Sequence, residues 1–328
     1  MRTNEEIRNE AWTKLWHEKW FWRILIASIL LDLSMQLVFK IIYFVANTCI
    51  GDLGTLSQTN LSNSLAMIAR GDMSALPTIT LHIAITAFMT IIATGITQFG
   101  KSTVLLRAAD GKQEGYLKAA FEGLKMPLGL AYLTLRVALV FILWGILAIL
   151  PCIGGAAICE LIAIDETSIK IAAWALIITA AATFSLAIIA IPFYRYRFLF
   201  RIKADNPEWS AGKCMRECRS LTQGNKWRIF KHDCSYWKIL LLPLIIGSAL
   251  SAIMLICLYK MKINFYAKTL ATPESMVFCF SVIGLYIAFI AVTIISAIYI
   301  SLGQTILYRD MLSENTKDTD NTDEKIGH

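Results

Sequence analysis

The sequence predicts an all-α fold, a polytopic bundle of about six transmembrane helices with amphipathic helices at the cytoplasmic membrane surface. Of the 328 residues, 56% are hydrophobic and 17% are charged, whereas a soluble domain has about 25% charged residues. The apolar residues also gather in runs of about 20, which is the length of helix that crosses a hydrocarbon core roughly 30 Å thick. Helices satisfy their own backbone hydrogen bonds in such a core, and open strands do not.

Six hydrophobic runs are long enough to span a bilayer. They are Ile24–Ala46, Pro77–Phe99, Pro127–Leu150, Ile171–Phe193, Ile239–Tyr259 and Val277–Leu302. The apolar segment Cys152–Ala163 follows Pro151 and contains two glycines, which predicts either an interfacial loop or a continuation of the third helix. We expect residues 1–312 to form one transmembrane domain. The polar residues 313–328 have no apolar anchors and should form a disordered cytoplasmic tail.

Lysine and arginine residues are concentrated on one side of these spans. The N-terminal segment, residues 101–125, residues 195–238 and the residues after Leu302 hold 24 of them, against five on the opposite side. Because positively charged loops stay in the cytoplasm, we expect both termini there and the protein in the cell (plasma or inner) membrane. The expected partners are the lipid bilayer, anionic headgroups and other membrane proteins. The net charge of +7 comes without a nucleic-acid-binding motif, which argues against nucleic acid.

Three segments on the basic side have apolar residues at helical spacing and should form amphipathic helices. The first carries Ile7, Ala11 and Leu15, with Trp12, Trp16 and Trp20 beside them, and the second covers Tyr116–Leu124. The third should begin with Asn206 as its cap and Pro207 at its first position, and end near Gly224. Its apolar stripe is Ala211, Cys214, Met215, Cys218 and Leu221.

The chain also contains a weak threefold pattern. Three spans end on a similar run, namely Leu105-Leu106-Arg107 before Asp110, Leu199-Phe200-Arg201 before Asp205, and Leu307-Tyr308-Arg309 before Asp310. One hypothesis is that three related helical hairpins build the protein. The alternative is that apolar residues followed by arginine are a common way for a helix to leave a membrane.

Residues 95–102, Gly-Ile-Thr-Gln-Phe-Gly-Lys-Ser, match the phosphate-binding loop pattern letter by letter. That loop needs a preceding strand and a helix whose first amides cradle the phosphates. Here the pattern stands at the end of an apolar helix. We therefore expect Gly95 and Gly100 to allow close helix packing and Lys101 to anchor the helix at the cytoplasmic side.

Three charged residues, Asp32, Lys40 and Arg136, lie within predicted spans, where charges are costly and mark functional candidates. Asp32 and Arg136 lie eight or nine residues into spans that start on the same side, or roughly 12–14 Å deep. Equal depth predicts an ion pair between them, with Gln36 one helical turn from Asp32. This polar group is either a clamp between two helices or the site of a transporter or channel.

No cofactor or metal is expected, and no catalytic constellation is visible, so we predict that the protein is not an enzyme. Cys214, Cys218, His232 and Cys234 could be imagined as zinc ligands, but their C-x3-C spacing departs from the usual pattern. Two of these cysteines lie on an apolar stripe, where cysteine packs as a small hydrophobe. A disulfide between Cys152 and Cys159 remains an alternative in an oxidising compartment.

One stretch of about 40 residues resembles a bacterial integral membrane family, domain of unknown function family 975. The resemblance rests on Lys203-Ala-Asp-Asn-Pro207, Ser210-Ala211, Arg216, Arg219, Ser220, Gly224-Asn-Lys-Trp-Arg228, Phe230, Asp233, Ser235 and Trp237. Weaker support comes from Trp144 to Pro151 and from Leu307 to Asp310. The sequence departs from the family after Pro151, where Cys152 replaces a glycine and a whole span precedes Asn206. The resemblance implies a multi-span membrane protein with no established activity.

The same stretch carries the residues that we expect to contact headgroups or a protein partner. They are Arg201, Arg216, Arg219, Lys226, Trp227 and Arg228. Arginine and lysine pair with lipid phosphate, and tryptophan prefers the membrane boundary. The expected function is therefore that of a non-catalytic multi-pass membrane protein with a basic cytoplasmic face. The alternative is a small-molecule or ion transporter or channel subunit that uses the region of Asp32 and Arg136.

Overall fold

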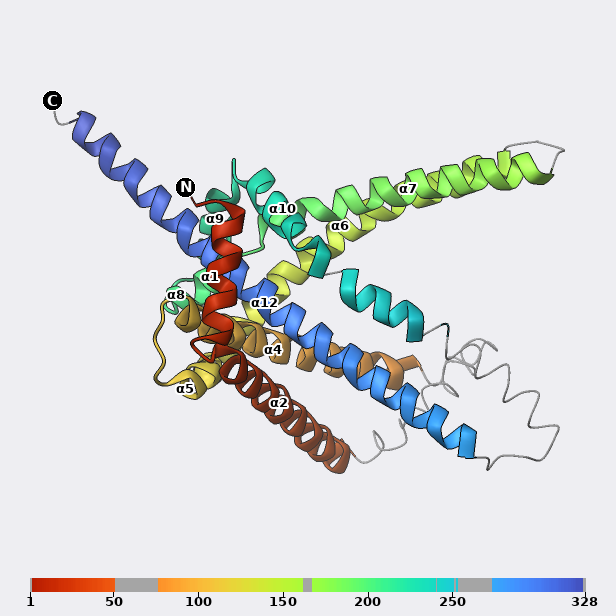
Figure 1. Cartoon of the computed structure of the whole chain (residues 1–328), viewed down its shortest axis with the longest axis horizontal. Helices are drawn as coiled ribbons and strands as arrows, with labels where there is room; N and C mark the ends of the chain where they lie inside the picture. Colours follow the sequence, from red (N-terminus) through yellow and green to blue (C-terminus); the bar gives the residue numbers. More distant parts are fainter. Residues whose placement is uncertain are drawn as a thin grey trace. The chain divides into compact units, whose positions relative to one another are not determined.

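The computed structural model describes residues 2–50, 76–161, 167–239, 241–250, 252 and 273–326. Within these ranges the backbone is helical apart from short turns, and no strand occurs, which confirms the all-α class (Figure 1). Five of the described helices are long and apolar enough to cross a membrane, namely Trp20–Ile42, Ile83–Ala109, Pro127–Glu160, Ile171–Asp205 and Tyr286–Asn315. These correspond to five of the six predicted spans.

The predicted span Ile239–Tyr259 is described only over its first half. Helices Lys226–Ser235 and Trp237–Leu250 meet at a bend of 44° and pass the same length and composition test when they are taken together. The described residues therefore contain five candidate spans, or six if this bent pair crosses as one. The end of the predicted span lies outside the described residues.

The chain separates into two compact units. Unit 1 contains Met1–Leu25, Ala108–Lys112 and Trp227–His328, and unit 2 contains Ile26–Arg107 and Gln113–Lys226. Helices α2 (Trp20–Ile50) and α4 (Leu76–Ala109) each pass from one unit into the other. The sequence predicted a single domain over residues 1–312, and each unit is described by itself below.

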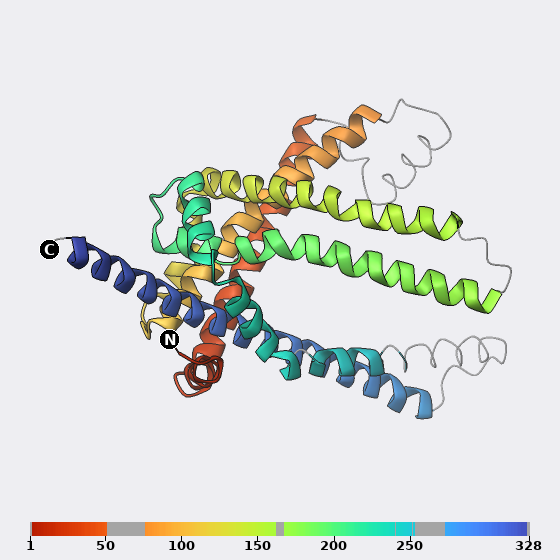
Figure 2. The same cartoon turned by 90° about the horizontal axis from the view of Figure 1, so that it is seen from above.

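The longest hairpin of unit 2 pairs α6 (Pro127–Leu161) with α7 (Thr167–Arg195), which run side by side in Figures 1 and 2. Helix α6 continues through Pro151, so the segment after it extends the third helix and is not a loop. The Ser185 hydroxyl of α7 donates to the Ala148 carbonyl, 2.6 Å away, in the turn before Pro151. A hydroxyl from a neighbouring helix is how membrane helices tolerate an internal proline.

The two cysteines of α6 are separate thiols. Cys152 Sγ lies 3.2 Å from Ser185 Oγ, and the Cys159 carbonyl accepts a hydrogen bond of 2.9 Å from Trp174 Nε1. Seven residues of one helix separate the two cysteines by about 10 Å of rise, and a disulfide cannot bridge that distance. The alternative of a Cys152–Cys159 disulfide is therefore wrong in this structure.

Near the other end of α6 lies the main apolar cluster of unit 2. It consists of Leu31 and Met35 from α2, Ile96 and Phe99 from α4, and Leu130 from α6. Short elements close around it: α5 (Tyr116–Phe121), η3 (Glu122–Lys125) and α8 (Leu199–Asp205). Phe121 and Phe200 from these elements pack against the cluster.

The glycines of the phosphate-loop-like pattern lie inside α4, where their backbone is helical. A Cβ at Gly95 would lie 2.7 Å from Thr134 Oγ1. A Cβ at Gly100 would overlap the Ala120 carbonyl oxygen and lie 2.7 Å from Leu31 Cδ2. The prediction that these glycines serve close packing is confirmed.

Helix α9 (Ala211–Thr222) begins four residues later than predicted. Ser210 is its N-cap, and the Ser210 hydroxyl accepts a hydrogen bond of 3.3 Å from the Lys213 amide. Asn206 is instead the C-cap of α8. The carbonyls of Pro207 and Trp209 accept hydrogen bonds from the Lys203 ammonium, so residues 207–209 form a turn and not the first turn of a helix. Helix α9 ends just before Gly224, whose φ is +85°, as predicted.

The predicted stripe of α9 is turned into the protein. Ala211, Cys214, Cys218 and Leu221 are buried, Met215 is partly buried, and α9 packs against α6, α7 and α8. This packing explains the helical spacing of those residues. It also means that protein, and not lipid, covers the apolar side of α9.

Unit 1 joins α1 (Asn4–Trp16) to the long helix α12 (Pro273–Ile326), which cross in Figure 1. Thr3 and Glu6 form a capping box at the start of α1. The predicted stripe Ile7, Ala11 and Leu15 is fully buried. Trp12 and Trp16 are exposed, whereas Trp20 is buried.

Helix α12 continues to Ile326, which differs from the predicted disordered tail. Arg228 of α10 (Lys226–Ser235) forms ion pairs with Asp310 and Glu314. These pairs join α10 to α12 on either side of Ser313, where the tail was expected to begin. Disorder was predicted because polar residues without apolar anchors seldom fold. The contacts that hold α12 here are ion pairs between polar residues, and composition alone does not reveal them.

Candidate functional site

Asp32 binds a different cation from the one that we predicted. Its carboxylate lies 3.0 Å from Lys101 Nζ of α4, and the two side chains are 44% and 34% exposed. Leu31 packs beside Phe99 and Ile96 of α4, and this contact brings Asp32 to Lys101. The prediction relied on the equal depth of Asp32 and Arg136 in the membrane. Depth does not show in which direction around its helix a side chain points, so it did not identify Lys101 as the partner of Asp32.

Arg136 lies elsewhere in unit 2. Its guanidinium carbon is 4.5 Å from the ring centroid of Tyr132, and Nη1 is 3.2 Å from where a Cβ on Gly212 would be. Gln36 is exposed. In the part of the chain that the structure describes, Arg136 forms no ion pair with any acidic residue. The predicted group of Asp32, Arg136 and Gln36 is thus not assembled.

A buried lysine organises the turn that leads into α9. Lys203 is 6% exposed, and its ammonium donates to the carbonyls of Pro207 and Trp209, the latter at 2.6 Å. Lys213 Nζ lies 4.0 Å from the ring centroid of Trp209. Sequence reasoning did not select Lys203, although a lysine four residues before a proline turn is the available signal.

Two side chains of α9 bind the end of α7. The Cys218 thiol and the Thr222 hydroxyl donate to the Arg195 carbonyl at 3.4 Å and 3.2 Å. The last carbonyls of a helix have no partner within it, so these two groups complete the C-terminus of α7. The start of α9 contacts Arg136 of α6, and its later turns contact Arg195 at the end of α7, so α9 bridges the two helices of the hairpin.

Burial controls the chemistry of the α9 cysteines. Desolvation raises the pKa of Cys218 to about 12. It also raises the pKa of Cys214, against the opposing effect of Lys203. The thiolate is the reactive form of cysteine, so both residues are inert packing groups.

We expect a maleimide to label Cys234, which is exposed, and to leave Cys214 and Cys218 unlabelled at pH 7.5 and at pH 9. With a pKa of about 12, the thiolate fraction of Cys218 is only about one in a thousand at pH 9. Peptide mapping by mass spectrometry measures the labels, and unfolding in dodecyl sulfate provides the positive control. Equal labelling of Cys218 and Cys234 in the folded protein would contradict this assignment.

The predicted headgroup residues divide into two groups. Arg201 is buried at 8% exposure, and Arg228 is bound to Asp310 and Glu314, so both serve the interior. Arg216, Arg219, Lys226 and Trp227 are exposed. Arg216, Arg219 and Lys226 form no ion pair within the described ranges.

The ion pairs of unit 1 join its segments. Arg228 Nη1 is 2.8 Å from Glu314, and its Nη2 contacts Asp310. Arg309 donates two hydrogen bonds to Asp110, of 2.9 Å and 2.8 Å. Arg309 and Asp110 come from two of the similar runs noted in the sequence, but their pairing does not test the threefold repeat, which stays a prediction.

Aromatic side chains fill the seam where α1, α10 and α12 meet. Tyr236 is fully buried and meets Tyr299 edge to face at 5.2 Å between ring centroids. The Tyr299 hydroxyl donates to the Arg8 carbonyl, and Arg8 donates to the Ser235 carbonyl. A Cβ at Gly303 would overlap the Tyr236 hydroxyl, so this glycine makes room for Tyr236.

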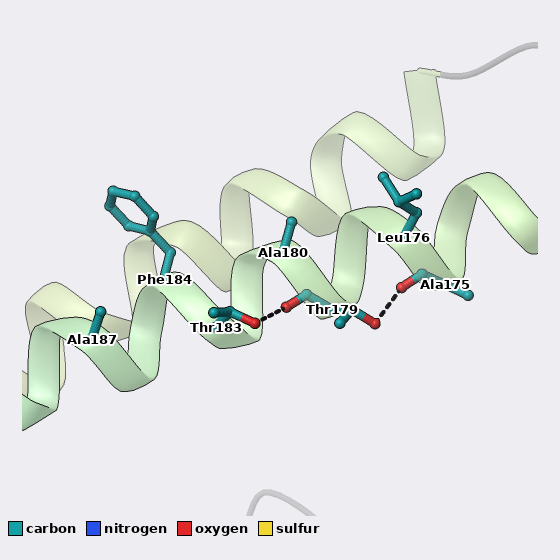
Figure 3. A pocket seen from close by; sticks show the side chains of 7 residues that line it. All are labelled: Ala175, Leu176, Thr179, Ala180, Thr183, Phe184 and Ala187. Carbon is teal, nitrogen blue, oxygen red and sulfur yellow. Dashed lines mark hydrogen bonds between the residues drawn. The ribbon is translucent and has the colours of Figure 1, made fainter. Parts of the chain in front are cut away.

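An open groove of about 730 Å³ lies on α7 (Figure 3). It is lined by Ala175, Leu176, Thr179, Ala180, Thr183, Phe184 and Ala187. The two threonine hydroxyls donate to the carbonyls of Ala175 and Thr179 on the same helix, as the dashed lines in Figure 3 show. The groove is therefore apolar. Across the described residues, no group of three or more His, Cys, Asp or Glu side chains could hold a metal ion.

The helices and their composition define the class of the molecule, a helical membrane protein. Comparison of the chain with models of protein families, with curated proteins and with solved structures finds no match. The resemblance to domain of unknown function family 975 therefore stays a prediction from the residues that carry it.

Proposed function

We propose that the protein is a non-catalytic, multi-pass protein of the cell membrane whose basic cytoplasmic face binds anionic lipid headgroups. The face consists of the exposed cations of α9 and the start of α10. Both termini lie on this cytoplasmic side. One observation carries the proposal: Arg216, Arg219 and Lys226 are exposed cations without an ion pair in the described structure, and the apolar side of α9, which carries the two arginines, is already buried.

The position of α9 supports a boundary at this level. From Arg136 to the end of α6 the helix has about 25 residues and a length of roughly 38 Å, enough to cross the roughly 30 Å hydrocarbon core. Arg136 and Arg195 both meet α9, so the polar side of α9 lies where the hairpin leaves the membrane. We assign Asp32 and Lys101 to the same side, because the apolar cluster that contains their neighbours Leu31 and Phe99 packs against Phe200 of α8.

Exposed arginine and lysine at such a boundary attract anionic lipid by about 1 kcal/mol for each cation. Protein covers the apolar stripe of α9, so the helix does not bind lipid by dipping that stripe into the bilayer. Lipid contact is therefore electrostatic and comes from the polar side of α9. Trp227, which is 62% exposed, supplies an aromatic side chain suited to the boundary.

We expect the triple variant Arg216→Gln/Arg219→Gln/Lys226→Gln to lose most of the enrichment of phosphatidylglycerol around the protein. The change removes three cations, each worth about 1 kcal/mol of attraction, without touching the buried stripe. The measurement is the phosphatidylglycerol fraction in nanodiscs formed from a fixed mixture with phosphatidylcholine, read by lipid mass spectrometry.

The matched control replaces Arg70, Lys260 and Lys262, which the sequence places on the opposite side, with glutamine. This control carries the same charge change and should leave the enrichment nearly unchanged. Equal enrichment in the wild type and the triple variant would overturn the proposed function. Equal losses in the two triple variants would show that net charge, and not this face, attracts the lipid.

The transport alternative has less support, because its premise was a site built from Asp32 and Arg136. Asp32 is paired with Lys101 on the neighbouring helix, which favours a clamp between α2 and α4. A partly exposed ion pair of this kind contributes at most about 1 kcal/mol. We therefore assign the pair a structural role and do not propose transport.

A further inference from the structure

We infer that a row of aromatic side chains on unit 1 contacts the bilayer where the lipid headgroups meet the acyl chains, on the cytoplasmic side. This aromatic row consists of five rings, each in contact with the next, in the order Tyr299, Trp12, Trp16, Phe21 and Trp22. Its partner is the bilayer itself, whatever the charge of the headgroups. The inference therefore goes beyond the proposed function and does not depend on it.

The three tryptophans of the aromatic row lie on the outside of the protein. Trp12, Trp16 and Trp22 are 48%, 36% and 60% exposed. The apolar stripe of α1 is fully buried, so the tryptophans form a second apolar surface, on another side of the helix. Large aromatic side chains that are exposed together on one surface mark a site of contact with a membrane or a partner.

Two buried rings hold the exposed tryptophans in place. Trp12 meets Tyr299 of α12 edge to face, with 5.5 Å between the ring centroids. Trp16 stacks on Phe21 at 5.0 Å, and Trp22 meets Phe21 edge to face at 5.1 Å. Tyr299 and Phe21 are each only 6% exposed. The outer surface of the row is therefore ordered before it meets a partner, which lowers the entropy lost on contact.

A tight turn between α1 and α2 joins the two halves of the row. Lys19 has a φ of +58°, which is uncommon for a residue that carries a side chain. The Lys19 amide donates to the Trp16 carbonyl at 3.4 Å, and the turn brings Phe21 back onto Trp16. A backbone conformation of this kind persists where the surrounding contacts hold it, and the stack of Phe21 on Trp16 is such a contact.

The positions of the two ends of the row identify the membrane boundary as its partner. Tyr299 lies three residues before Leu302, the predicted end of the span in α12. Trp22 lies two residues before Ile24, the predicted start of the first span. At 1.5 Å per residue, each ring is within about 5 Å of the end of a span. Tryptophan prefers this level, because its ring is apolar and its N–H can donate to lipid oxygen.

The first test is photo-crosslinking of the full protein in the membranes of the cells that express it. Benzoylphenylalanine replaces Trp12, Trp16 or Trp22, one position at a time, and on illumination it attaches to C–H bonds that touch it. We expect each of the three variants to form a covalent adduct with phospholipid, detected by mass spectrometry of the protein. Thr13 is the matched control position, exposed on the same helix about 100° around it from Trp12, and should lose most of the lipid adduct.

A second test uses the natural side chains and measures their depth. The protein is reconstituted in phosphatidylcholine that carries bromine either near the headgroup end or near the methyl end of its acyl chains, since bromine quenches tryptophan fluorescence on contact. We expect bromine near the headgroup end to quench more strongly. The triple variant Trp12→Phe/Trp16→Phe/Trp22→Phe should lose much of that difference. Trp20→Phe, which changes a fully buried ring of the same segment, should keep it.

The outcomes distinguish lipid from its alternatives. Adducts with protein in place of lipid would overturn the assignment in favour of a partner protein or a second copy of the chain. If no adduct formed and the triple variant kept all of the quenching, the aromatic row would face water and the inference would be wrong. Stronger quenching by bromine near the methyl end would also overturn it, because the row would then lie inside the hydrocarbon core. Phosphatidylcholine has no net charge, so these results do not depend on the basic face of α9.

Discussion

Replacing Gly100 with alanine is expected to destabilise unit 2 by about 3 kcal/mol, the upper part of the range for overpacking a well-packed site. The added Cβ would overlap the backbone carbonyl of Ala120 and meet Leu31. Backbone cannot yield as a side chain tip can, and Leu31 is fully buried. Unfolding in mixed micelles with increasing dodecyl sulfate, followed by circular dichroism, measures the change.

Gly129→Ala is the matched control for this experiment. Gly129 lies in α6 of the same unit, and a Cβ there would meet nothing within 4 Å. Alanine is the better helix former by up to about 1 kcal/mol, so this variant should be neutral or slightly more stable. A loss of less than about 0.5 kcal/mol for Gly100→Ala would show that α4 and α5 are not packed as described.

Replacing Arg228 with methionine is expected to destabilise unit 1 by about 2–4 kcal/mol, because it leaves two carboxylates without their main cation. The Arg228 and Asp310 side chains are only 16% and 9% exposed, so water compensates little. The same dodecyl sulfate titration gives the magnitude. Proteolysis near Glu314 reports whether the end of α12 is released.

Two further variants test the physical cause. Arg219→Met removes an exposed cation and should change stability by no more than about 0.5 kcal/mol. The triple variant Arg228→Met/Asp310→Leu/Glu314→Leu removes all three charges and should recover much of the stability, because the loss comes from unpaired buried charge. If the triple variant were less stable than Arg228→Met, the described ion pairs would not be the cause.

Much of the fold could be predicted because bilayer-length runs and helical spacing are properties of the chain itself. The stripes Ile7-Ala11-Leu15 and Ala211-Cys214-Cys218-Leu221 each lie on one helix, as their spacing predicted, but protein covers them where the prediction placed these helices at the membrane surface. The start of α9 could not be predicted. Asn206-Pro207 is a good helix start in isolation, but the Lys203 ammonium takes the carbonyls that follow it.

The candidate site was predicted less well, because spacing along one helix does not show what lies opposite. Asp32 and Arg136 were predicted to pair with each other, but Asp32 pairs with Lys101, and Arg136 lies against Tyr132 and Gly212. Arg228 was assigned to lipid because it stands in a basic run, whereas its partners lie more than 80 residues away at Asp310 and Glu314. Pairings at that separation leave no signal in a single sequence.

Unit 1 combines segments that are far apart in the sequence, Met1–Leu25 and Trp227–His328, and this separation affects how the protein folds during its synthesis. The buried stripe of α1 leaves the ribosome before all of unit 2, yet it packs against α12, which is synthesised after unit 2. Unit 2 is contained in residues 26–226 apart from the short segment 108–112, so it can assemble while synthesis continues. Until α12 arrives, the apolar side of α1 needs a temporary cover, and the membrane insertion machinery or a chaperone has to supply it.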